Sequence, residues 1–137
     1  MKKLPLFVAS LLVPGFFHQA GAQEMQPGLY TSTVTMEMTD GKKQVTDDQD
    51  CITPKDIADG LTRIGIEADT DCKIQNFAKD NGRITYRLAC EDGSKKLLSD
   101  VVGTYTTNSY EFTIKPASSG VIFKLMSVKG KRLGVCK

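Results

Sequence analysis

The residues of this chain with the clearest chemistry are four cysteines: Cys51, Cys72, Cys90 and Cys136. Thiolates bind zinc when they are clustered, but here 20, 17 and 45 residues separate successive cysteines and no C-x-x-C pair occurs. An even number of cysteines in a small exported chain instead indicates two disulfides. We therefore expect structural cysteines, with no metal and no cofactor.

Two cysteine pairings follow from the spacing. The loop Asp80-Asn81-Gly82 indicates a hairpin, and its middle residue lies nine positions from both Cys72 and Cys90. A three-residue loop would place these two cysteines directly opposite each other, within disulfide reach. The second bridge, Cys51–Cys136, then follows by elimination. The alternative pairing is Cys51–Cys72 with Cys90–Cys136, in which the first bridge brackets a short helix.

Carboxylates form the second chemical group. Acidic residues precede two of the cysteines: Asp47, Asp48, Asp50, Glu67, Asp69 and Asp71. Alternating carboxylates are hard oxygen ligands of the kind that Ca²⁺ prefers, but the EF-hand spacing is absent. We interpret them as solvated charge runs. A hydrolase built on paired carboxylates is the weakest functional hypothesis, because the positions expected to face inward are apolar or aromatic.

The N-terminal segment predicts export. Met1–Lys3 is positively charged, Leu4–Phe17 is apolar except for one serine, and Ala20-Gly21-Ala22 matches the motif that signal peptidase cleaves. The apolar stretch is shorter than the ~20 residues that a bilayer span needs. We expect a signal peptide over residues 1–22, cleavage after Ala22, a periplasmic location and a single domain over residues 23–137.

Cleavage of the signal peptide would also remove a residue type used in catalysis and metal binding. The signal peptide contains the only histidine, His18, together with Lys2 and Lys3. The remaining chain holds 16 basic and 16 acidic residues and no histidine, which excludes Ser-His-Asp triads, Cys-His dyads and histidine-bound metals. A balanced charge gives no footprint for nucleic acid. We expect a protein that is not an enzyme, with a small apolar ligand or an envelope protein as its partner.

The elements that would position these residues are mostly β-strands. Strands are expected over residues 29–38, 42–50, 72–79, 83–91, 97–107, 110–115 and 121–132. Apolar and polar residues alternate clearly over 83–91 and 110–115, whereas 42–50 is a polar strand that returns after the Asp40-Gly41 turn. A short helix is expected after Thr53, because this residue is a good N-cap and Pro54 suits the first helical position. The pattern predicts a mainly β fold: an antiparallel meander of about seven strands, closed as a small barrel or packed as a sandwich, with one short inserted helix.

Four aromatic residues fall on the expected inner faces of these strands: Tyr86, Tyr105, Phe112 and Phe123. Aromatic residues at strand spacing fill a core or line an apolar pocket, and a small barrel can enclose a lipid-like ligand. The main hypothesis is a carrier of a small apolar molecule. The alternative is a protein-interaction module, such as an inhibitor or assembly partner of an envelope enzyme, that uses loops and an outer face.

Several short motifs resemble a known family across nearly all of residues 23–137. They are Pro27-Gly28-Leu29-Tyr30, Cys51-Ile52-Thr53-Pro54, Cys72, Cys90 and Gly130-Lys131-Arg132-Leu133-Gly134-Val135-Cys136. The family is domain of unknown function 3617, small exported proteins of Gram-negative bacteria. The resemblance implies an exported location and the domain limits. It implies no activity.

Overall fold

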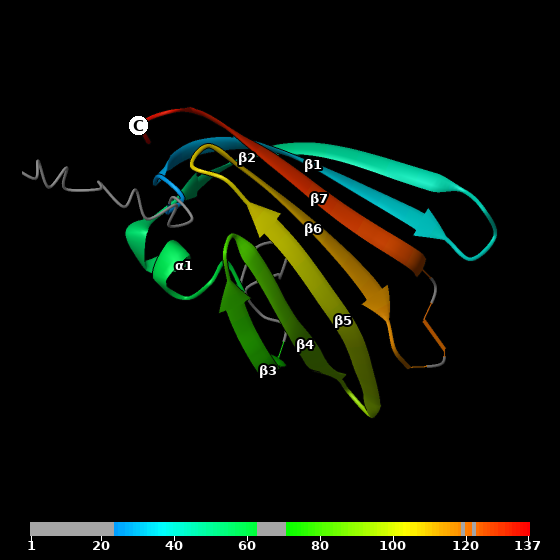
Figure 1. The fold of residues 1–137 in the computed structure, drawn as a ribbon. Helices are drawn as coiled ribbons and strands as arrows, with labels where there is room; N and C mark the ends of the chain where they lie inside the picture. Colours follow the sequence, from blue (N-terminus) through cyan, green and yellow to red (C-terminus); the bar gives the residue numbers. More distant parts are fainter. Residues whose placement is uncertain (1–23, 63–70, 119, 122) are drawn as a thin grey trace, which may run out of the picture.

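The computed structural model describes residues 24–62, 71–118, 120–121 and 123–137. The described residues form seven strands and one helix (Figure 1). In chain order these are β1 (Gly28–Met38), β2 (Lys43–Ile52), α1 (Pro54–Ala58), β3 (Asp71–Asp80), β4 (Arg83–Asp92), β5 (Lys95–Tyr105), β6 (Ser109–Pro116) and β7 (Phe123–Gly134). The mainly β fold with one short helix is therefore confirmed, whereas the predicted signal peptide lies outside the described residues.

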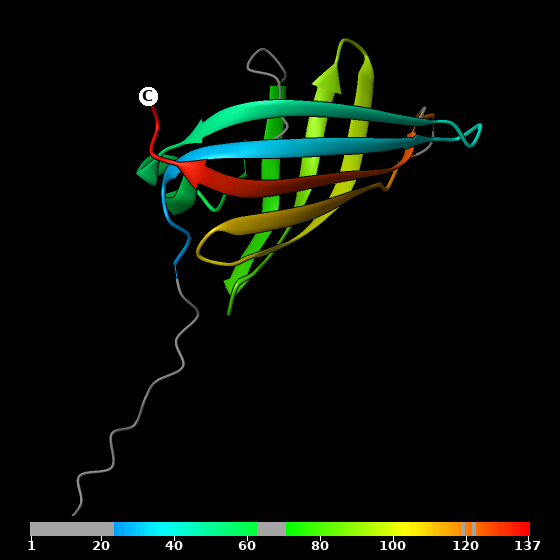
Figure 2. The same cartoon turned by 90° about the horizontal axis from the view of Figure 1, so that it is seen from above.

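The strands make one antiparallel sheet in the order β2-β1-β7-β6-β5-β4-β3. Successive strands from β3 to β7 are neighbours, β1 and β2 form a hairpin, and β7 returns beside β1. Figures 1 and 2 show that this sheet is strongly twisted and curves around a concave face, which we call the trough. The edge strands β2 and β3 do not pair, so the expected small barrel or sandwich is wrong: the sheet is single and open.

Parts of the chain outside the strands complete the core of the open sheet. Met25 comes from the segment before β1, and Ile57 and Leu61 come from α1 and the turn after it; all three pack against the core formed by the strands. Gly60 and Leu61 have φ angles of 72° and 59°, which end the helix and direct Leu61 inward, where it is 3% exposed. These side chains therefore cover one part of the concave face.

Local signals that the sequence carries are found where they were expected. Thr53 caps α1: its hydroxyl accepts a bond from the Asp56 amide at 3.2 Å, and the Asp56 carboxylate accepts one from the Thr53 amide at 2.8 Å. This is a capping box, with Pro54 in the first turn. Asn81 and Gly82 turn β3 into β4 with φ angles of 47° and 77°.

The pairing Cys72–Cys90 with Cys51–Cys136 is confirmed, with Cα–Cα distances of 4.0 Å and 5.6 Å. The predicted three-residue loop is wrong, however. Asp80 pairs directly with Arg83, so the turn has two residues, and a register shift between Gln75 and Ala78 restores the alignment that places the cysteines opposite each other. The β-bulge supplies the residue that the shorter turn removes.

Candidate functional site

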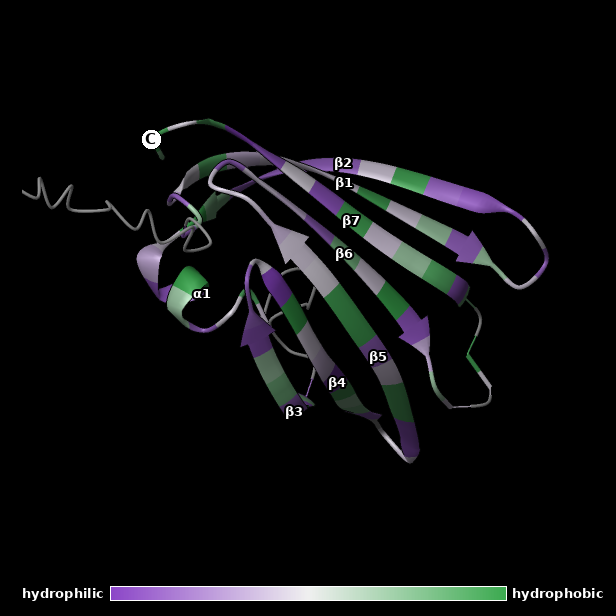
Figure 3. Cartoon of the chain, viewed as in Figure 1, coloured by the Kyte–Doolittle hydropathy of each residue, from purple (hydrophilic) through white to green (hydrophobic). Residues whose placement is uncertain are grey.

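Apolar and polar residues alternate along the central strands (Figure 3), and the buried apolar side chains of these strands lie on the trough face. Cross-strand partners share a face of a sheet, so the register identifies its residues. Tyr30, Ser32, Val34, Met36 and Met38 of β1 share this face, as the alternation in the sequence predicts. Across the sheet they align with Val128 and Met126 of β7, Phe112 and Ile114 of β6, Val101 of β5, and Ile84 and Tyr86 of β4.

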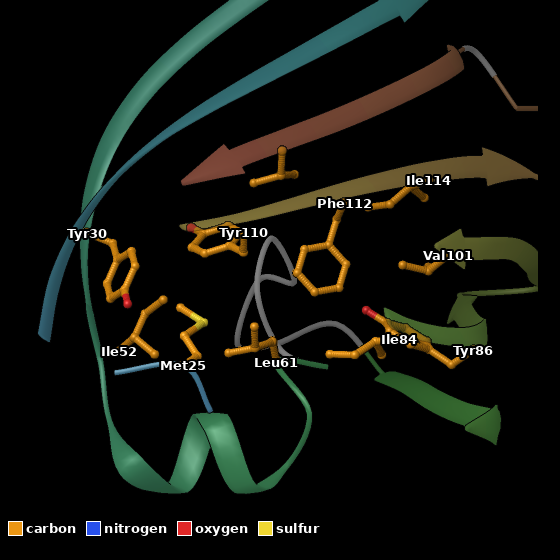
Figure 4. Packing of buried hydrophobic residues seen from close by; sticks show 11 residues of the cluster. Met25, Tyr30, Ile52, Leu61, Ile84, Tyr86, Val101, Tyr110, Phe112 and Ile114 are labelled. Atoms are coloured by element: carbon orange, nitrogen blue, oxygen red, sulfur yellow. The ribbon is translucent and has the colours of Figure 1, made fainter. Parts of the chain in front are cut away.

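The end of the trough beside α1 is filled, and we call it the closed end (Figure 4). Tyr30, Ile84, Val101 and Val128 are at most 2% exposed there and in the adjoining centre of the sheet. The buried cluster is Met25, Tyr30, Ile52, Leu61, Ile84, Tyr86, Val101, Tyr110, Phe112, Ile114 and Val128. Burial of this kind leaves no room for a ligand.

Two glycines allow the rings at the closed end to lie flat against the sheet. A side chain at Gly130 would collide with the ring of Tyr110, and one at Gly103 would collide with the ring of Phe112. The two rings are also neighbours, with centroids 5.9 Å apart. Glycine within a strand marks a close approach, and here the approaching groups are aromatic rings. The pairing of each ring with a glycine on the next strand explains why both strands tolerate a residue without a side chain.

The two tyrosines at the closed end differ in their hydrogen bonds. The Tyr30 hydroxyl donates to the carbonyl oxygen of Gln26 at 2.5 Å. The Tyr110 hydroxyl is buried and makes no hydrogen bond of acceptable geometry with any described group, although Ser32 lies near it and acts to lower its pKa. Burial, assisted by the negative charge of Asp50, raises the pKa of Tyr110 to about 12. Both hydroxyls therefore stay protonated, and neither is poised as a base.

Three of the motifs that carry the family resemblance meet at this same end, whereas Cys72 and Cys90 lie on the β3–β4 hairpin. The Arg132 guanidinium donates from Nε to the carbonyl oxygen of Pro27 at 3.1 Å. A side chain at Gly28 would strike the carbonyl oxygen of Gly134 and the side chain of Arg132. The Cys51–Cys136 disulfide lies close by, just before the residue that caps α1. These motifs therefore join the two ends of the chain and build the fold, and they supply no reactive group.

The opposite end of the trough is only partly covered, and we call it the open end. Its half-buried apolar side chains are Val34, Met36, Met38, Leu88, Phe123 and Met126. Val34 and Met38 are four residues apart on β1, so this surface extends for about 13 Å along the strand. Sequence reasoning placed Met36 and Met38 on the inner face but did not identify the methionines as a binding surface. Their flexible, polarizable side chains suit a variable apolar partner.

The four aromatic residues expected to line a pocket lie on the trough but do not gather in one place. Tyr86 and Phe112 are 6% and 3% exposed and belong to the buried cluster. Tyr105 is half-buried at the closed end, with the Lys79 ammonium 5.3 Å from its ring centroid. Phe123 is half-buried at the open end, opposite Met38. Of the four rings, Phe123 is the one beside the methionines.

A hollow of about 350 Å³ lies between α1 and β3, beside the trough, and its lining includes Ile74, Phe77 and Thr62. Ile74 is 37% exposed and Phe77 is 46% exposed, which is unusual for apolar side chains of this size in an otherwise polar edge strand. Phe77 also contacts the ring of Tyr86, with centroids 6.4 Å apart. Lys55 of α1 and Asp59 at its end also line the hollow, so its surface is mixed and is not a continuation of the apolar face.

The acidic residues form no cation site in the described part of the chain. Asp47 faces the convex side, where its carboxylate accepts a hydrogen bond from the Thr33 hydroxyl at 2.7 Å, whereas Asp48 and Asp50 face the trough side of β2. Glu67 and Asp69 lie outside the described residues. No group of three or more potential metal ligands occurs within residues 24–62 and 71–137 as far as these are described.

One further ion pair on the convex face resembles a catalytic group only in its perturbed pKa. The Arg87 guanidinium donates from Nε to the Asp100 carboxylate at 2.8 Å, and this hydrogen bond holds the pKa of Asp100 below its usual range. Both side chains are substantially exposed and lie on an open sheet surface. The pair links β4 to β5 and encloses no space for a substrate.

Comparison with known proteins identifies a family and little else. The family model described as "Protein of unknown function (DUF3617)" matches residues 25–136. No curated protein and no solved structure matches the chain significantly. Among the described residues, no helix is long and apolar enough to cross a membrane.

Proposed function

The chain belongs to the DUF3617 family, and we propose that it is a non-catalytic binding domain that holds a small apolar or lipid-like molecule at the open end of the trough. The observation that carries this proposal is the unequal burial of one continuous apolar face. Soluble domains usually cover such a surface with their own residues, and a contiguous apolar patch left accessible is typical of a binding site.

The chemistry of the open end supports an apolar ligand. Its side chains are aliphatic, aromatic or thioether groups, and the charged pair nearest to it, Lys124 and Glu37, is 3.9 Å apart on the adjoining strands. An acyl chain that lies along Met36, Met38 and Met126 meets their thioether and methylene groups. The hydrophobic effect is therefore sufficient to hold such a ligand.

A periplasmic location is part of the proposal. It is supported by the A-x-A motif that ends at Ala22 and by two disulfides, which persist in oxidising compartments. The intact mass of the exported protein tests it: a chain that begins at Gln23 supports cleavage, and a mature product that retains His18 contradicts it.

The binding test uses hexadecanoic acid as the probe. Native mass spectrometry of the purified protein should detect co-purified lipid, and titration with hexadecanoic acid should give saturable binding. Met126→Glu places a charge in the proposed site and should weaken binding at least tenfold. The matched control is Val102→Glu on the convex face, where the side chain is 38% exposed and binding should not change. Absence of both retained lipid and hexadecanoic acid binding in the folded protein would overturn the proposal.

A protein-interaction role is the second candidate, and one observation favours it. Both edges of the sheet are unpaired among the described strands, and exposed edges recruit strands from other chains. Co-purification of a stable protein partner without lipid would support this role over the carrier.

A further inference from the structure

Strand β2 presents an unusually regular free edge. Residues 43–51 are all exposed, and the register with β1 runs from Gly28 opposite Ile52 to Glu37 opposite Lys43 without a bulge. Long, flat and exposed edges are templates for pairing with another strand. The other edge is different, because β3 contains a register shift near Asn76, whose φ angle is 55°. A bulge of this kind prevents edge pairing.

The hydrogen bonds of the hairpin identify which groups of β2 face outward. The Met38 amide donates to the carbonyl oxygen of Lys42 at 2.8 Å, so Lys42 directs its carbonyl towards β1, while its own amide donates to the Asp40 carboxylate at 2.9 Å. Because this orientation alternates along an antiparallel strand, Lys43, Val45 and Asp47 direct their amides and carbonyls away from the sheet. The next outward amide, that of Gln49, is bonded to the Asp48 carboxylate at 2.8 Å. The unpaired stretch is therefore centred on Val45.

We propose that β2 pairs antiparallel with β2 of a second copy of this chain, about a two-fold axis at Val45. In this register Val45 lies opposite Val45, and Lys43 lies opposite Asp47 on the convex face. On the other face Lys42 lies opposite Asp48. The two-fold axis repeats each pair, so four Lys–Asp pairs flank the contact. Isologous pairing of this kind closes as a dimer and leaves no further edge of the same type.

Charge selects this register over its neighbours. An axis at Asp47 would oppose two like charges, which is destabilising across strands. An axis at Thr46 would place Val45 opposite Asp47 and Lys43 opposite Gln49. This register forms no Lys–Asp pair on the convex face. The axis at Val45 also covers a valine that is 63% exposed in the single chain. Exposure of a β-branched residue at the centre of a free edge is explained when it meets its own copy.

The contact is small, which sets the expected affinity. Three residues from each strand form about six backbone hydrogen bonds. We expect the contact to bury less than the ~1,200–2,000 Å² that is typical of stable complexes. We expect a reversible dimer with a dissociation constant in the micromolar range or weaker. Since the Lys–Asp pairs are exposed, added salt should weaken it.

The decisive experiment is sedimentation equilibrium of the purified protein over a wide concentration range. The expected result is a monomer–dimer equilibrium. Lys43→Asp and Asp47→Lys each place like charges opposite each other twice and should raise the dissociation constant at least tenfold, whereas the double variant Lys43→Asp/Asp47→Lys should restore dimerisation. The matched control is Lys115→Asp, an exposed lysine on the convex face of β6, which should leave the equilibrium unchanged.

Backbone and cross-linking variants test the edge and the register separately. Val45→Pro removes an outward amide without removing a bond to β1, so circular dichroism should be preserved and the dimer should be lost. Val45→Cys should form a disulfide-linked dimer, because paired residues on the axis have Cα atoms about 5.5 Å apart. Gln49→Cys should not. A monomer at all concentrations, a dimer insensitive to Lys43→Asp and Val45→Pro, or cross-linking through Gln49→Cys alone would overturn the proposal.

Discussion

The closed and open ends of the trough are built from the same pattern of alternating strand residues, yet only one of them is a core. At the closed end Tyr30 is completely buried, and at the open end Met38, on the same face of the same strand, is half-buried. The difference comes from Met25, Ile57 and Leu61, which pack against the strands at the closed end. A strand pattern therefore determines which face is apolar, and segments outside the sheet determine whether that face is covered.

Under the proposed function, this contrast separates stability from binding within one small domain. Side chains at the closed end contribute free energy of folding because they are almost fully removed from water. Those at the open end contribute less to folding, and we propose that they contact the ligand. Three of the family motifs meet at the closed end, where Arg132 contacts Pro27 and Cys51 is bonded to Cys136, whereas Cys72 and Cys90 lie on the β3–β4 hairpin. In each case the contacts join strands or chain segments of the fold.

The two disulfides give the largest expected effects, one at each end of the trough. Cys51–Cys136, at the closed end, bridges a sequence separation of 85, and Cys72–Cys90, on the β3–β4 hairpin towards the open end, bridges 18. The entropy of the unfolded chain predicts a loss of about 4.5 kcal/mol on removing the first and about 3 kcal/mol on removing the second. Paired Cys→Ser variants measured by urea unfolding check this order. Equal losses would show that loop length does not govern the difference.

The next effect compares one aromatic residue from each end. Phe112→Ala should lower the free energy of unfolding by about 3–5 kcal/mol, because the ring is 3% exposed and covers Gly103. Phe123→Ala should cost less than half as much, because its ring is half-buried at the open end. Chemical denaturation of both variants measures the ratio. Similar losses would mean that the open end is as well packed as the closed end, and the carrier proposal would lose its main support.

The sequence determined those features that depend on neighbours along the chain or on one turn. Alternation placed Met36 and Met38 on one face of β1, Thr53 predicted the start of the helix, and the spacing of Cys72 and Cys90 predicted their disulfide. The bulge between Gln75 and Ala78 has no such local signal, and it compensated for an incorrect turn length. The packing of Leu61 and Met25 against the strands is a long-range contact that no period in the sequence encodes.

Alkaline titration provides a smaller effect that reports on burial alone. Burial raises the pKa of Tyr86 and of Tyr110 to about 12, whereas an unfolded tyrosine titrates near 10. Stability from this source is intact below pH 10 and is lost as the pH rises towards 12, because the unfolded chain releases protons that the folded chain retains. Between pH 9 and pH 11 each tyrosine should cost about 1.4 kcal/mol. Urea unfolding of the parent protein and of Tyr86→Phe at pH 9 and pH 11 checks this. Between these pH values the free energy of unfolding of Tyr86→Phe should fall by about 1.4 kcal/mol less than that of the parent.

The smallest predicted effects compare the two tyrosine hydroxyls of the closed end. Tyr30→Phe removes a hydroxyl that donates to the Gln26 carbonyl and should cost about 1 kcal/mol at neutral pH. Tyr110→Phe removes a buried hydroxyl that lacks a hydrogen bond of acceptable geometry among the described groups, so it should be neutral or slightly stabilising. Removal of a polar group is favourable when the folded state does not compensate for its desolvation. Thermal unfolding of both variants shows whether each substitution lowers or raises the stability. A clear loss of stability in Tyr110→Phe would mean that the Tyr110 hydroxyl has a hydrogen-bond partner in solution, such as Ser32 after a small rotation or a buried water. The closed end would then contain a buried polar interaction as well as apolar packing.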